Sequence, residues 1–139
     1  MSTPAYHIPV MLDQCIEGLA ILPNGVYVDV TFGGGGHSKA ILAKLGPEGR
    51  LFSFDQDPDA WEQAEKIEDE RLTLITANFR CLEKYLRLRR VKQVDGILAD
   101  FGVSSFQLDA PERGFSIRFD GPLDMRMGPS ASMTAAELL

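Results

Sequence analysis

Short apolar runs alternate along the chain with segments whose apolar residues recur at helical spacing. Four runs have the length and composition of buried β-strands, at residues 26–31, 50–54, 71–76 and 94–99. The helical spacing predicts one helix before the first run, over residues 9–20, and one helix after each of the first three runs, ending near residues 45, 67 and 90. Strands that alternate with helices predict an α/β fold whose parallel sheet is joined by right-handed crossovers.

Four consecutive glycines, Gly33 to Gly36, follow the first run and precede a helix. Glycine lets a ligand lie against the bare backbone, and the helix N-terminus offers unpaired N–H groups to a polar or anionic group. The dinucleotide pattern G-x-G-x-x-G fails, because its last glycine would fall on Ser38 or Lys39, and the phosphate-binding pattern G-x-x-x-x-G-K-[ST] is absent. The turn is typical of a nucleotide-type cofactor site of another kind.

Asp55 ends the second strand, twenty-two positions after Gly33. A carboxylate at this place can accept both hydrogen bonds of a ribose diol. Since the loop has no phosphate-binding signature of its own, the combination favours S-adenosylmethionine over NAD. The alternative is a tight strand-to-helix turn followed by a surface aspartate.

One set of residues directly follows the four predicted strands: Gly33–His37, Asp55, Phe79 and Asp100. Ligands of open α/β sheets bind beyond the carboxyl ends of the strands, so we expect this set to line one site. Two members have a structural alternative. The helical pattern of residues 79–90 turns Phe79 toward the core, whereas its place after the third strand puts it in this set. His37 has helix capping as its alternative role.

Composition and length fit one domain of 139 residues, 45% of them apolar. The sequence has no apolar run near the length of a membrane span and no N-terminal signal pattern. Cys15 and Cys81 lack metal-ligand spacing, so we expect no metal site and two reduced core thiols in a cytoplasmic protein.

The net charge of −6 argues against strong non-specific binding to nucleic acid. One predicted helix nevertheless has a basic outer face with a single acid, Glu83. An RNA-facing patch and a solvated helix face are both open interpretations of its basic residues, which are Arg80, Lys84, Arg87, Arg89, Arg90 and Lys92.

Periodicity is lost from residue 101 to residue 129. A loop of this length in a compact domain is usually functional or disordered, and the aromatic residues Phe106, Phe115 and Phe119 argue against disorder. Thr134 and Glu137 then form a capping box that opens a helix near the end of the sequence, so we expect the polypeptide to continue. A sheet of four strands would also leave an exposed edge, which is prone to pairing with another copy.

Five motifs resemble those of the bacterial RsmH/MraW family, in order and with the separations found there. This family comprises S-adenosylmethionine-dependent methyltransferases that act on the N4 amine of a cytidine in 16S, or small-subunit, ribosomal RNA. The motifs are HIPVML (7–12), VDVTFGGGGHS (28–38), FDQDP (54–58), DFGVSSFQLD (100–109) and ERGFSIRFDGPLDMRM (112–127).

The resemblance implies a Rossmann-like class I methyltransferase fold whose C-terminal part is missing. Residues 1–110 would form the N-terminal part of the methyltransferase core, and residues 111–139 an active-site loop and the start of an inserted helical domain. The implied partner is small-subunit ribosomal RNA or the small ribosomal subunit, with no membrane association and with a homo-oligomer as an option through the sheet edge.

The resemblance also implies the site residues. Asp100 would be catalytic, and the contacts to S-adenosylmethionine would come from Gly35, Gly36, His37, Asp55, Phe79, Asp100 and Gln107. Two positions depart from the family, which usually has leucine where Phe101 stands and proline where Phe106 stands. Both changes enlarge the side chain beside the expected pocket.

Three alternatives remain beside this function. A dehydrogenase would need the missing third glycine of the dinucleotide pattern. A non-catalytic cofactor-binding or RNA-binding fragment is more serious, because the resemblance covers only part of a fold, and we expect this chain alone to be inactive. The third alternative is a methylase of another nucleobase amine.

Overall fold

The computed structural model describes residues 8–139, so the first motif, which begins at His7, lies partly outside the described residues. Its four strands are all parallel and form one sheet in the order β3-β2-β1-β4. They are β1 (Val26–Asp29), β2 (Arg50–Phe54), β3 (Leu72–Ile75) and β4 (Gly96–Leu98). The predicted α/β class and all four strand runs are confirmed. Three of the strands, β1, β3 and β4, are shorter than the apolar runs that predicted them.

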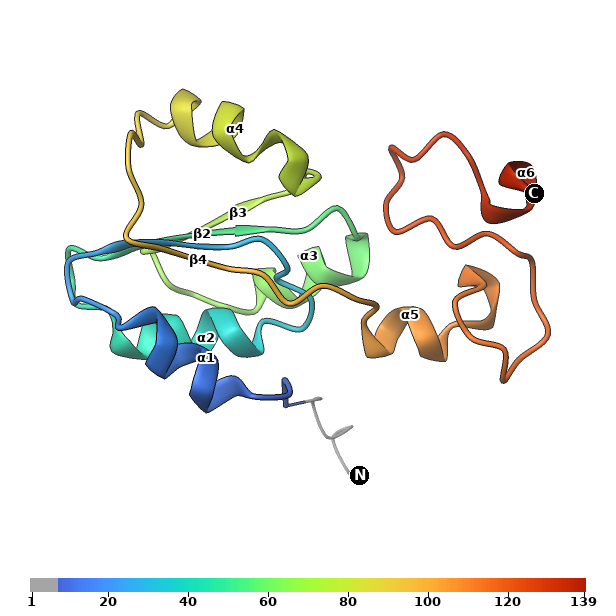
Figure 1. Ribbon diagram of the computed structural model, residues 1–139, viewed down its shortest axis with the longest axis horizontal. Coiled ribbons are helices and arrows are strands. Elements are labelled where there is room, and N and C mark those ends of the chain that lie inside the picture. Colours follow the sequence, from blue (N-terminus) through green and yellow to red (C-terminus); the bar gives the residue numbers. More distant parts are fainter. Residues whose placement is uncertain (1–7) are drawn as a thin grey trace.

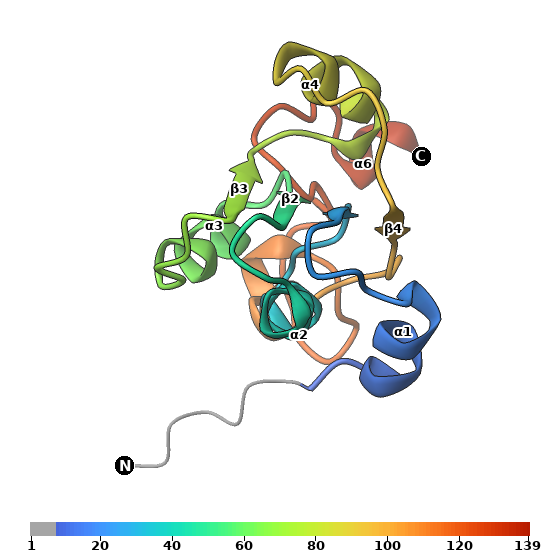
Figure 2. The same cartoon turned by 90° about the vertical axis from the view of Figure 1, so that its left-hand side faces the viewer.

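Helices cover both faces of the sheet. Helix α4 lies on one face, and the first three helices lie on the other (Figures 1 and 2). The helices before β4 are α1 (Leu12–Leu19), α2 (Gly36–Lys44), α3 (Pro58–Glu65) and α4 (Leu82–Leu88), the last preceded by a 3₁₀ turn, η1 (Phe79–Cys81). After β4 come α5 (Ser105–Asp109), η2 (Pro111–Arg113) and α6 (Ala135–Leu138).

Alternation along the strands divides the core between the two faces. Val28 and Phe54 point toward α4, where they join Ile75 and Leu86. Tyr27 points to the opposite face and packs against the buried side of α2. Near-complete burial of these side chains from water supplies the main driving force for folding and fixes the register of the parallel strands.

A buried network of hydrogen bonds joins β1, α2 and β2. The Ser38 hydroxyl donates to Asp29 Oδ2 at 2.7 Å and lies 2.8 Å from the Ser53 hydroxyl, and all three residues are fully buried. The Thr31 N–H donates to Asp29 Oδ1 at 3.0 Å. Burial raises the pKa of the Asp29 carboxyl, although these hydrogen bonds act in the opposite direction. This network therefore anchors the start of α2 beneath the glycine turn.

Neighbouring residues mark the start of α3. Asp57 is its N-cap and accepts from the Asp59 N–H, with Pro58 in the first turn. Thr134 and Glu137 also form the predicted capping box, at the start of α6. Among residues 8–139, no helix is long and apolar enough to cross a membrane.

Two predictions about local structure are wrong. Phe79 does not turn into the core, since it lies in the 3₁₀ turn ahead of α4 and is 42% exposed. The stretch 101–129 is not irregular throughout. It contains α5, which opens with a capping box formed by Ser104 and Gln107, and then η2. The predicted domain boundary at residue 110 falls between these two elements.

Strand β4 pairs with β1 alone within the described residues, and Ile97 in its centre is half exposed. It is one of the two edges of this sheet, and β3 is the other. Pairing of this edge with another copy stays a prediction.

We predict that Ser38→Ala lowers the free energy of unfolding by about 1–3 kcal/mol, because it removes a donor from the buried Asp29 carboxylate. Urea unfolding followed by circular dichroism measures the change. Ser132→Ala, at an exposed position, is the control and should stay within about 0.5 kcal/mol of the wild type. Equal stability of the two variants would show that the buried hydrogen-bond network contributes nothing to the free energy of unfolding.

Candidate functional site

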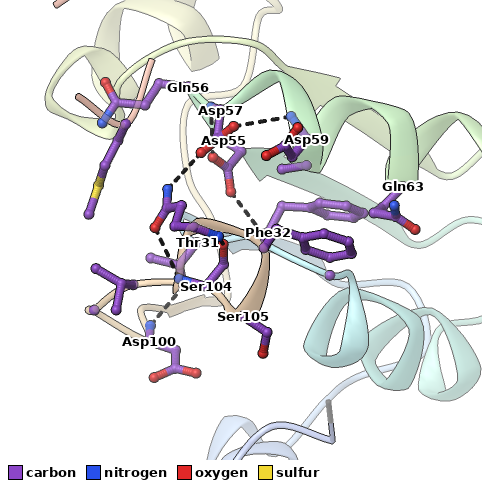
Figure 3. A pocket seen from close by; sticks show the side chains of 18 of the residues that line it. Thr31, Phe32, Asp55, Gln56, Asp57, Asp59, Gln63, Asp100, Ser104 and Ser105 are labelled. Atoms are coloured by element: carbon purple, nitrogen blue, oxygen red, sulfur yellow. Dashed lines mark hydrogen bonds between the residues drawn. The ribbon is translucent and has the colours of Figure 1, made fainter. Parts of the chain in front are cut away.

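A cavity of about 1440 Å³ lies beyond the carboxyl ends of the strands, between the glycine turn, the start of α3 and the segment after β4 (Figure 3). It brings together six of the seven predicted cofactor residues: Gly36, His37, Asp55, Phe79, Asp100 and Gln107. Gly35 is not among the lining residues. The prediction that the residues after the four strands line one site is thus confirmed for their positions.

Gly35 has a conformational role. Its φ is +82°, and a Cβ at this position would lie 2.8 Å from the Phe32 ring. Gly33 also has a positive φ, of +54°. These two glycines turn the chain from β1 into α2 and leave the backbone of the turn facing the cavity.

Asp55 holds this turn in place. Its Oδ2 accepts from the Gly33 N–H at 2.8 Å, and its Oδ1 accepts from the Asp57 N–H at 3.0 Å. Partial burial raises the pKa of the Asp55 carboxyl, against the effect of these two backbone donors. A carboxylate has about four acceptor sites, so Asp55 retains capacity for a ligand. The sequence did not reveal its link to Gly33.

His37 is buried on α2, 4% exposed, and its Nε2 has no hydrogen-bond partner among residues 8–139. Its Nδ1 lies 3.9 Å from Asp100 Oδ2. The Asp100 side chain is 57% exposed, while its backbone N–H donates to Thr31 Oγ1 at 2.8 Å. An unpaired buried nitrogen is costly and indicates that this wall of the cavity suits a polar ligand.

Aromatic rings form a second wall. The rings of Phe79 and Phe101 lie 5.4 Å apart between centroids with a tilt of 40°, and both side chains are exposed. Phe106 also lines the cavity. Two of these three residues are the positions that depart from the family pattern. Exposed aromatic faces of this kind suit stacking with a planar ring.

Asp57 connects the start of α3, at the edge of the cavity, to the segment after β4. Its Oδ2 accepts from Gln107 Nε2 at 2.6 Å and from Arg113 at 2.7 Å, and its Oδ1 accepts from Arg113 at 3.1 Å. Asp57 and Gln107 are buried. The Gln107 amide is therefore already bonded to protein on the cavity wall, and its contact with a cofactor stays a prediction.

Gln56 completes a hub at residues 55–57. Its Oε1 accepts from Asn78 Nδ2 at 3.2 Å, beside Phe79. A Cβ added to Gly128 would collide with the Gln56 carbonyl oxygen, so the backbone of the C-terminal segment packs directly on this residue. Asp55 and Asp57 lie close together near the start of α3, with Asp100 apart from them on the loop after β4 (Figure 3). Sequence reasoning found Asp55 but missed the roles of Gln56, Asp57 and Arg113 at the site, although all three lie in the quoted motifs.

The model of the MraW methylase family matches residues 4–139. Three curated relatives are each named Ribosomal RNA small subunit methyltransferase H. The relative from Flavobacterium psychrophilum is 62% identical over 129 residues, which cover 93% of this chain and 44% of the relative. The relative from Cytophaga hutchinsonii is 57% identical over 96% of this chain and 45% of its own length. The relative from Porphyromonas gingivalis is 56% identical over 96% and 43%. The chain thus spans less than half the length of these relatives.

We predict an acid-sensitive contribution from Asp57. Burial raises the pKa of its carboxyl, but hydrogen bonds from Arg113, Gln107 and the Asp59 N–H outweigh this and hold the pKa below the ordinary value. A depressed folded-state pKa stabilises the protein above the unfolded-state pKa, and the stabilisation is lost as the pH falls through the folded-state pKa.

Asp57→Asn keeps an N-cap residue and removes the charge. At pH 7 the variant should unfold with about 2 kcal/mol less free energy than the wild type, as for hydrogen bonds to a charged group. The difference should begin to shrink below about pH 4, where the carboxyl of the unfolded state takes up a proton, and should shrink furthest once the pH falls through the lower folded-state pKa. Urea titrations across this range measure it, and a constant difference would contradict the assignment.

Proposed function

Because this chain belongs to the MraW methylase family, we propose that it is the cofactor-binding part of an S-adenosylmethionine-dependent methyltransferase. The proposed substrate is the exocyclic N4 amine of a cytidine in small-subunit ribosomal RNA. The observation that carries the proposal is the cavity at the strand ends, where six of the seven residues expected to contact the cofactor meet. The names of the relatives support ribosomal RNA as the substrate.

The residues around the cavity fit this cofactor. The glycine turn presents bare backbone, and Asp55 has acceptor capacity for a ribose diol. Phe79 offers an exposed ring face for adenine. The unpaired His37 Nε2 would gain a partner from a polar group of the amino-acid end.

S-adenosylmethionine would supply a methyl group already activated on a sulfonium. The residues of the protein must then prepare the amine, whose lone pair is conjugated with the cytosine ring. Asp100 and the Phe101 carbonyl would accept its two N–H hydrogens and so favour a pyramidal nitrogen, and Asp100 would take the released proton. The bond from the Asp100 N–H to Thr31 fixes the backbone at this position.

RNA contact would involve the outer face of α4. The stretch 80–92 contains six of the fourteen basic residues and one of the twenty acidic residues. All six basic residues are exposed, while Leu82, Tyr85 and Leu86 pack against the core. Phe79, at the cavity, directly precedes this stretch. An RNA strand whose base enters the cavity could therefore place its phosphates on the basic side chains of residues 80–92.

Two parts of the proposal concern the whole protein. Residues 111–139 would lead into an inserted domain, and the protein would act in the cytoplasm, where its substrate is found. We expect this chain alone to bind the cofactor and to transfer no methyl group, because most of the RNA-binding surface would lie in the remaining half of the relatives' length. A methylase of another nucleobase amine is the second candidate, and the relatives' names do not favour it.

We predict that Asp55→Ala weakens the binding of S-adenosylmethionine by about 1.5–3 kcal/mol, the range for a hydrogen bond to a charged group. Isothermal titration calorimetry on this chain measures the change. Asp69→Ala removes a carboxylate that pairs with Arg71 away from the cavity and should leave the affinity unchanged. Wild-type affinity in a folded Asp55→Ala chain would refute the ribose assignment, and absence of binding by the wild type would refute the proposed cofactor.

We predict that Asp100→Ala, in an enzyme of full family length that contains this chain, lowers turnover by about a hundredfold or more, as expected for a lost transition-state partner. The measurement is transfer of tritiated methyl groups to small ribosomal subunits that lack the modification. The Flavobacterium psychrophilum relative is the positive control, and the 139-residue chain is expected to be inactive. Unchanged turnover with a raised Michaelis constant for the cofactor would make Asp100 a binding residue only.

A further inference from the structure

We propose that Arg113 is a positioning residue for cofactor binding. Its ion pair with Asp57 holds Gln107 in the wall of the cavity, so that the site is complete only while residues 104–113 are docked on the start of α3. The inference rests on the proposed function for the identity of the cofactor. Its structural half, the docking of α5, can be measured independently.

Arg113 makes an unusually complete set of contacts. Its two terminal nitrogens donate to both oxygens of Asp57, and one of them also donates to Asp59 Oδ2 at 3.0 Å. The other donates to the carbonyl oxygens of Arg126 and Met127 at 3.1 and 3.3 Å. One side chain thus joins three places in the chain: the start of α3, η2 and the backbone near residue 127.

Gln107 depends on the same carboxylate. Its amide nitrogen donates to Asp57 Oδ2, while its Oε1 accepts from the Ser104 N–H at 3.0 Å. The Ser104 hydroxyl in turn accepts from the Gln107 N–H. Helix α5 has only five residues, and a helix of that length is unstable without tertiary contacts. The pair of Asp57 with Arg113 therefore helps to hold α5 and its capping box against the cavity.

A merely stabilising ion pair would act differently, and the chain contains one for comparison. Arg71 donates to both oxygens of Asp69 and to the Leu45 carbonyl oxygen, and none of these three residues lines the cavity. Both pairs are of the same chemical type. Loss of Arg71 should lower the stability of the sheet, whereas loss of Arg113 should change the population of molecules with a complete site.

The expected effect follows from this population. If the site is complete in only about one molecule in ten of Arg113→Met, the dissociation constant for S-adenosylmethionine rises about tenfold, because apparent affinity scales with the competent fraction. Arg113→Lys keeps the charge and loses the two-pronged geometry, so it should show a smaller increase. Arg71→Met should bind with wild-type affinity despite lower stability.

The test combines calorimetry with hydrogen exchange on the wild type and the three variants. In Arg113→Met, we expect faster exchange at amides 105–113, unchanged exchange in the four strands, and weaker binding. Wild-type exchange and affinity in a folded Arg113→Met chain would overturn the proposal. Equal loss of affinity in Arg71→Met would also overturn it, since general destabilisation would then be the cause.

Failure of the proposed function gives a different pattern. If the wild type binds no S-adenosylmethionine, both the cofactor and the role of Arg113 in binding it are refuted. Hydrogen exchange would still show whether Arg113 holds α5. Where Arg113→Met does not fold, the same criteria apply to Arg113→Lys.

Discussion

One buried carboxylate, that of Asp57, connects the sheet to the segment that follows it. It caps α3, accepts the amide of Gln107 and pairs with Arg113 through both oxygens. Removal of a partner from a buried ion pair leaves an uncompensated charge, which is far more costly than loss of a surface pair. The position of residues 104–113, and with it one wall of the cavity, therefore depends on this group.

Three nearby aspartates differ in their pKa values because their donors differ. Burial raises the pKa of Asp29 and of Asp55, whose hydrogen bonds come only from neutral N–H and hydroxyl groups. Asp57 is buried too, but the Arg113 guanidinium and two further donors hold its pKa below the ordinary value. Burial thus makes two carboxylates harder to ionise, Asp29 beneath the glycine turn and Asp55 at the cavity, whereas a cation keeps Asp57 ionised.

Local patterns predicted the elements of the fold well. The apolar run at 50–54 is β2 in full, and the sequence Asp57-Pro58 marks the start of α3 because the capping rule involves neighbouring residues only. The pairing of Asp57 with Arg113 could not be predicted in this way, since fifty-six residues separate them. Phe79 shows the opposite failure. Its helical spacing with Leu82 suggested burial, but the backbone there forms a 3₁₀ turn, which changes the direction of the side chain.

The same distinction applies to the site. Topology alone predicted that Asp55, Phe79 and Asp100 would meet, because the carboxyl ends of parallel strands share one edge. Topology did not predict that Asp55 and Gln107 would form hydrogen bonds with other residues of the protein. These bonds fix the cavity walls before a ligand enters, which lowers the entropy cost of binding. The residues that a motif assigns to the cofactor therefore also build the site, and a substitution at either position changes the shape of the cavity, apart from any effect on a predicted contact with the ligand.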